Sequence, residues 1–148
     1  MALEFTIVPS IRDVDPVAWD ECAGRHPFVR HAFLSALEDS GAVGPKRGVL
    51  PGYALLFDRP QNIVACAPVM LKSGTRREFG PEARWLRAGL ASGTFKWPKL
   101  QAGVPFFPVM GPKLLTRRGH AADALRAALL AGLRGWWQRL EGDVFNVM

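Results

Sequence analysis

The part of the sequence with the clearest chemical pattern runs from residue 104 to residue 120. An apolar segment leads there into a short basic turn, and Arg117 and Arg118 stand immediately before a stretch rich in alanine and leucine that is typical of a helix. The N-terminus of a helix carries about half a positive charge, so two arginines are unfavourably placed there unless an anion binds beside them. Glycines and exposed backbone N–H groups at such a turn are typical of phosphate sites. The pattern therefore predicts an anion-binding turn, and the alternative is that both arginines are solvated residues of a basic protein.

The residues expected to hold the anion lie in the turn and on both of its sides. They are Val109, Met110, Gly111, Lys113, Arg117, Arg118, Gly119 and His120. His120 would adjoin the phosphate groups, so we interpret it as a hydrogen-bond donor and not as a base. Acyl carriers that enter sites of this kind bring a pyrophosphate, and the turn is therefore a candidate site for an acyl donor.

Acyl transfer from a thioester to an amine needs a group that takes a proton from the amine and donors that stabilise the oxyanion. His31 is the first candidate for the base, because it begins an expected helix that could face the polar loop at residues 72–84. Glu78, within that loop, is the second. The alternatives are a structural histidine that caps its own helix and a solvated carboxylate.

Composition limits the class of protein. The chain has 148 residues, of which 49% are hydrophobic and 22% charged, and this predicts one globular domain. Its net charge of +6 favours an anionic partner, and a cofactor phosphate, RNA or a membrane surface would each fit. Cys22 and Cys66 lie far apart in apolar surroundings and are expected to be buried free thiols. The sequence has neither a signal peptide nor a run of about 18 apolar residues, so a cytoplasmic protein without a membrane span is expected.

Hydrophobic periodicity and turn residues predict the elements that position these groups. The expected strands are residues 5–8, a hairpin of 53–57 and 63–71, an extended segment at 97–107 and a last strand at 143–148. The expected helices are residues 16–24, 31–41, 82–88 and 121–140. This order implies an α/β or α+β sheet with helices on both faces. Because the sequence stops within an apolar strand, we expect a fragment of a longer protein.

Two details of these elements bear on packing. Pro68 has no N–H to donate and should limit the strand ladder around it. Gly132 and Gly135 each weaken the long helix by about 1 kcal/mol relative to alanine, which indicates close packing against a neighbour. Trp136 and Trp137 are expected to pack in the core and at a dimer surface.

Three motifs in order along the chain resemble the FemAB-like members of the GNAT acyltransferase superfamily, which are often labelled as peptidoglycan biosynthesis proteins. The motifs are residues 25–41, residues 67–72, and residues 97–101 with 104–108. The resemblance covers about residues 15–148 and implies a GNAT-like, mixed and mostly antiparallel sheet flanked by helices on both faces. Family members are longer and contain two GNAT-like halves, so the sheet would be incomplete at the C-terminus.

The resemblance also implies a function. The first expectation is an acyltransferase that moves an acyl group from a coenzyme A thioester to an amine, with no metal. The second is a Fem-type enzyme that uses aminoacyl-tRNA as the donor, which the positive charge would suit. The third is a truncated, non-catalytic domain that binds a partner or a second copy of itself through the strand edge at residues 144–147.

Overall fold

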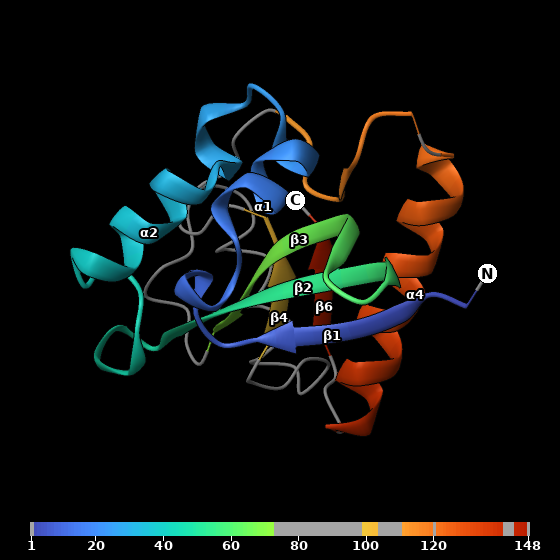
Figure 1. Ribbon diagram of the computed structural model, residues 1–148. Coiled ribbons are helices and arrows are strands. Elements are labelled where there is room, and N and C mark those ends of the chain that lie inside the picture. Colours follow the sequence, from blue (N-terminus) through green and yellow to red (C-terminus); the bar gives the residue numbers. More distant parts are fainter. Residues whose placement is uncertain (1, 73–98, 104–110, 120, 141–143, 148) are drawn as a thin grey trace.

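The computed structural model describes residues 2–72, 99–103, 111–119, 121–140 and 144–147. In these residues a six-stranded sheet, with the order β1-β2-β3-β4-β6 and β5 paired with β3, lies between α1 and α2 on one face and α4 on the other (Figure 1). The strands are β1 (Glu4–Val8), β2 (Val49–Arg59), β3 (Asn62–Lys72), β4 (Lys99–Ala102), β5 (Leu115–Thr116) and β6 (Val144–Val147). The helices are α1 (Pro16–Ala23), α2 (His31–Asp39) and α4 (Ala122–Arg139), with short 3-10 turns η1 (Ile11–Asp13), η2 (Pro27–Val29) and η3 (Pro45–Arg47). The expected fold class is confirmed, whereas the helix expected at residues 82–88 lies outside the described residues.

The two helices on the first face begin and end for local reasons. The Asp15 side chain accepts a hydrogen bond from the Ala18 N–H at 2.8 Å, Pro16 opens α1, and Gly24 ends it with a φ of 66°. The predicted boundaries of this helix are confirmed. Helix α2 has no side-chain cap at its N-cap residue, Arg30, and instead the His31 N–H donates to an Asp20 carboxylate oxygen at 2.8 Å. The two helices are therefore joined through Asp20.

The central hairpin of β2 and β3 is confirmed, and its strands are longer than predicted. The turn contains Gln61, which has a φ of 64°, and the ladder continues outward to the pair Val49 and Lys72. Pro51 and Gly52 within β2 are poor strand formers, and for this reason the sequence pattern predicted a later start. Pairing along almost the whole length of β3 outweighs that local preference.

Pro68 lies where β3 changes its partner. On the side of β2 the ladder runs through the pair of Tyr53 and Pro68 without a break. On the other side β4 pairs with β3 only as far as Val69, and β5 begins opposite Cys66. The Pro68 carbonyl accepts from the Gly103 N–H at 2.9 Å. The prediction that Pro68 limits the ladder is thus confirmed for this side of β3. The β4 ladder ends at Val69, just after the proline, and the β5 ladder lies at Ala65 and Cys66, just before it.

Helix α4 connects this region to β6, which runs parallel to β4. The apolar stripe of α4 is buried, as the periodicity predicted, and it packs on the face of the sheet opposite α1 and α2. The buried members of the stripe are Leu125, Leu129, Leu133 and Trp137. Gly132 lies against the Phe5 ring of β1, so the close packing expected there is confirmed, whereas Gly135 has ordinary space around it. None of the helices in the described ranges has both the length and the apolar character needed to cross a membrane.

A carboxylate holds η1, α2 and β2 together. Glu38 accepts hydrogen bonds from the Ser10 hydroxyl at 2.7 Å, the Ile11 N–H at 2.9 Å and the Tyr53 hydroxyl at 2.7 Å. Burial raises the pKa of Glu38, but these three hydrogen bonds outweigh it and hold the pKa below its ordinary value. Burial, with the neighbouring carboxylate, raises the pKa of Tyr53.

This network predicts an acid-sensitive contribution to stability. Because the pKa of Glu38 is lower in the folded chain than in the unfolded one, its contribution is fully present above the unfolded value of about 4.3 and is lost as the pH falls through the folded value. We expect urea denaturation between pH 3 and pH 7 to show a smaller loss of stability on acidification for Glu38→Gln than for the parent. Glu4→Gln, at an exposed position of β1, is the control and should follow the parent. Parallel curves for the parent and Glu38→Gln would contradict this role.

Candidate functional site

The turn singled out by its two arginines lies between β5 and α4, and its preceding segment packs against η2. Gly111 has a φ of 137°, and a β-carbon at this position would stand 2.0 Å from Nε2 of His26. Only glycine adopts this backbone conformation easily, and only glycine leaves room for the imidazole ring. His26, the residue before η2, therefore supports the loop that precedes β5. No local sequence pattern indicates this contact, although His26 falls within the first motif of the family resemblance.

Arg117 is fixed by three residues of β3 and α1. Its N–H donates to the Val64 carbonyl at 2.9 Å, and its guanidinium donates to the Asn62 side chain and forms an ion pair with Glu21 of α1. These contacts join the end of β5 to the hairpin and to α1. Much of the donor capacity of Arg117 is thus already used within the chain, in contacts that hold the turn in place.

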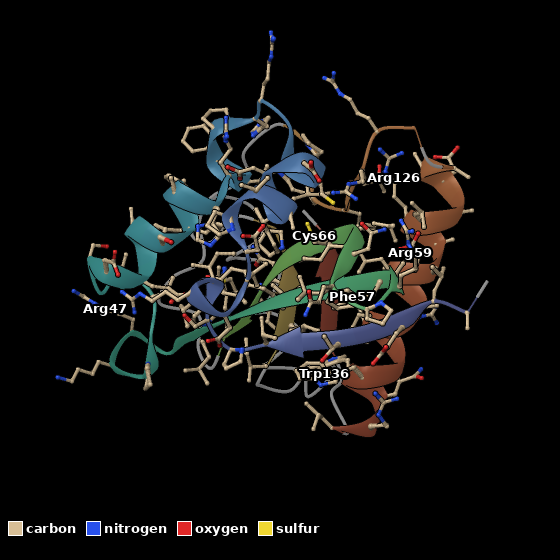
Figure 2. All side chains as sticks on the ribbon, in the orientation of Figure 1. Arg47, Phe57, Arg59, Cys66, Arg126 and Trp136 are labelled. Atoms are coloured by element: carbon tan, nitrogen blue, oxygen red, sulfur yellow. The ribbon has the colours of Figure 1, made fainter. Side chains whose placement is uncertain are left out.

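The next basic groups are more accessible to a ligand. Arg118 is exposed, and Gly119 follows it with a φ of 82° and no atom near the position of a β-carbon. Arg126 adds a further guanidinium from α4, beside the loop (Figure 2); it donates to the Leu114 carbonyl at 3.4 Å and pairs with Asp123 at 3.2 Å. Helical spacing places Arg126 just beyond the first turn of α4, and this signal could have identified it from the sequence.

The remaining predicted anion-binding residues divide into two groups. Lys113 is buried at the start of this segment, and the burial lowers its pKa below the ordinary value for lysine. Val109, Met110 and His120 lie outside the described residues, as does the candidate base Glu78.

His31 lies between α2 and η1, where both of its ring nitrogens have neighbours. Nε2 is 2.9 Å from the Ile11 carbonyl oxygen and 3.0 Å from that of Val14. Carbonyl oxygens only accept, so Nε2 carries the proton and donates to them. Nδ1 lies 3.4 Å from the Ser35 hydroxyl. These contacts favour a structural role for His31. The side chain ties α2 to η1, whereas the expected structural role was a cap on its own helix.

The variant His31→Gln separates the two interpretations. Loss of the imidazole contacts is expected to lower the free energy of unfolding by about 1 kcal/mol, the usual value of a lost hydrogen bond. A structural histidine leaves the rate of acyl transfer unchanged, whereas a lost general base lowers it by about 10²- to 10⁴-fold. Thermal unfolding and initial rates on the same preparation measure both effects, with Ser35→Ala as a control for the weakest of the three contacts.

Two further expectations concern cysteine and metal. Cys22 and Cys66 are buried free thiols in the core between α1 and the sheet, as expected. In the part of the chain that the structure describes, no group of three or more His, Cys, Asp or Glu side chains is arranged to hold a metal ion.

Comparison with solved structures defines the class of fold. The ribosomal-protein-alanine N-acetyltransferase from Brucella melitensis biovar Abortus 2308 superposes with a TM-score of 0.52 and 9% identity, over 99% of this chain and 79% of that chain. The aminoglycoside antibiotic 6′-N-acetyltransferase AAC(6′)-Ih from Acinetobacter baumannii gives a TM-score of 0.49 and 11% identity, with the same coverage. The first of these likenesses shows that the chain shares the GNAT-type fold of that protein.

The family follows from the sequence. The family model of the FemAB-like proteins, described as peptidoglycan biosynthesis/recognition, matches residues 10–147. The chain therefore belongs to the FemAB-like family, and the resemblance carried by its three motifs is confirmed. A comparison with curated proteins finds no significant match.

Proposed function

We propose that this chain is an acyltransferase domain that accepts an acyl group from a coenzyme A thioester and passes it to an amine. The observation that carries the proposal is the basic turn before α4. Ala121, the N-cap residue of α4, offers no side-chain hydrogen bond, so the first N–H groups of the helix lack the usual side-chain acceptor. Arg118 and Arg126 lie at the same end of the helix. A pyrophosphate there would accept from the backbone and from both guanidinium groups.

Each predicted residue has a role in this proposal. Arg118 and the backbone around Gly119 contact the phosphates directly, together with His120 as a donor. Arg117 holds the turn through Glu21. The remaining predicted residues, Val109, Met110, Gly111 and Lys113, shape the segment that leads into the turn.

For the proton transfer we propose Glu78 as the general base, with His31 as the alternative. Both nitrogens of His31 already have neighbours, and a base must reach the proton of the acceptor amine directly or through one water. Replacing Glu78 by glutamine would remove the base and keep the shape of the side chain.

The test of the donor site is the affinity for coenzyme A. We expect Arg118→Ala to weaken binding about tenfold, equivalent to about 1.4 kcal/mol, because one charge-assisted hydrogen bond is lost. Arg134→Ala is the matched control, since Arg134 is also exposed but lies on α4, roughly 18 Å along the helix axis from its first residue. Isothermal titration calorimetry measures both. Equal affinities for the parent and Arg118→Ala would remove the turn from the site.

Two other functions remain as competing proposals, each with its own observable. A Fem-type enzyme would bind aminoacyl-tRNA with a steep dependence on salt and would not bind coenzyme A tightly. A non-catalytic domain that pairs through β6 would self-associate in light scattering and show no turnover.

A further inference from the structure

The end of the β2–β3 hairpin carries an arginine that is not among the residues of the proposed donor site. Arg59 is the last residue of β2, and its side chain is 72% exposed. Its Nε lies 3.8 Å from an Asp58 carboxylate oxygen, a distance too long for a hydrogen bond. That oxygen already accepts from the Asn62 side chain. The donors of the Arg59 guanidinium are therefore available to a ligand at the surface.

Contacts between the hairpin and the basic turn place this arginine beside the proposed donor site. Arg59 pairs with Asn62 across the hairpin turn. The α-carbons of such paired residues are about 5 Å apart. The Asn62 side chain in turn accepts a hydrogen bond from the Arg117 guanidinium. A single residue thus separates Arg59 from the turn at which we propose that the pyrophosphate binds.

Other guanidinium groups gather at the same end of the sheet. Figure 2 shows Arg59 and Arg126 on one side of the molecule, both next to α4. Arg118 is exposed in the turn itself. Three segments distant in sequence, which are the hairpin, the turn and α4, therefore each contribute an arginine. Positive groups collected in this way favour an anion that has several phosphate groups.

The carboxylates near these arginines are already engaged within the chain. Asp58 accepts from Asn62, Glu21 pairs with Arg117, and Asp123 pairs with Arg126. Arg59 has the weakest of these attachments, since its carboxylate neighbour is the most distant one. It is consequently the arginine of this group that an added phosphate would recruit at the lowest cost.

We propose that Arg59 binds a third phosphate group of the acyl donor, the 3′-phosphate on the ribose of coenzyme A. The inference rests on the proposed function for the identity of the donor. A phosphate monoester carries a charge of about −1.5 to −2 at pH 7. A guanidinium group binds such a phosphate through two parallel hydrogen bonds. The nucleotide is the most polar end of the donor, and an exposed arginine suits a group that stays at the surface.

The test compares coenzyme A with dephospho-coenzyme A, which lacks only the 3′-phosphate, by isothermal titration calorimetry. We expect the parent to bind coenzyme A about tenfold more tightly, the effect of one added charge-assisted contact. Arg59→Gln should abolish this preference and bind dephospho-coenzyme A as the parent does. Arg59→Lys keeps the charge and should retain part of the preference. Arg118→Ala should weaken both ligands equally, because it acts on the pyrophosphate.

Arg47→Gln is the matched control. Arg47 is also exposed, and it lies in η3, before the start of β2. Arg59 ends the same strand, so the two arginines are roughly 30 Å apart along it. The control variant should bind both ligands as the parent does. Thermal unfolding of the variants checks that each remains folded, which is expected for substitutions at exposed positions.

Three outcomes would overturn the inference. If the parent binds the two ligands equally, no residue recognises the 3′-phosphate, and the proposed donor site itself is unaffected. If Arg59→Gln keeps the preference of the parent, another residue holds this phosphate. If the parent binds neither ligand, the proposed function fails together with the inference. In that case a salt-dependent affinity for tRNA that Arg59→Gln weakens would assign the arginine to a nucleic-acid backbone.

Discussion

Replacing Gly132 by alanine is expected to lower the free energy of unfolding by about 2–3 kcal/mol, because the new methyl group would overpack a filled interface. A β-carbon at Gly132 would stand 2.4, 2.6 and 2.9 Å from three ring atoms of Phe5. Such distances force β1 and α4 apart or turn the ring out of its position. The higher helix propensity of alanine, about 1 kcal/mol, offsets only part of this cost.

Gly135 provides a matched control on the same helix. A β-carbon there would meet only the end of the Arg139 side chain, at 3.7 Å, which is an ordinary contact. Gly135→Ala should therefore stabilise the chain by about 0.5–1 kcal/mol through helix propensity alone. Urea denaturation of both variants gives the comparison. Stabilisation by both substitutions would contradict the packing of Phe5 on α4, whereas Phe5→Ala should relieve much of the cost of Gly132→Ala in the double variant.

Gly111→Ala is expected to disturb the proposed donor site and the stability of the chain together. Alanine at a φ of 137° is strained, and its β-carbon would overlap the His26 ring. Strained backbone of this kind costs about 1–3 kcal/mol, and the overlap adds to it. Since the loop leads into the basic turn, we expect the affinity for coenzyme A to fall by more than tenfold.

Gly119→Ala separates the effect of backbone strain from the effect of overlap with a neighbouring side chain. Gly119 also has a positive φ, 82°, but no atom lies within 4 Å of the position of a β-carbon. Its substitution should cost backbone strain only and have the smaller effect on stability. The double variant of Gly111→Ala with His26→Ala should recover part of the loss, because the overlap is removed and the strain remains. Equal effects of the two glycine substitutions, with no recovery in the double variant, would show that His26 does not support the loop. Calorimetry and thermal unfolding measure these effects.

The sequence by itself determined the elements whose causes are local. Asp15, Pro16 and Gly24 define α1 through a cap, a first-turn proline and a left-handed end. The hairpin follows from two apolar runs around a polar turn, and α4 follows from the 3.6-residue spacing of its leucines. Capping, turn formation and amphipathic spacing depend on neighbours within a few residues, so the sequence order already contains them.

Only the tertiary structure decided which distant residues meet. The antiparallel pairing of β3 with β4 places Lys72 opposite Lys99, and β6 pairs parallel to β4 on its other side. The same packing brings His26 to Gly111 and Glu21 to Arg117. Each of these contacts joins segments separated by tens of residues, and its formation depends on strand register and on how the helices pack on the sheet. No short pattern encodes such choices, because they result from the packing of the whole core.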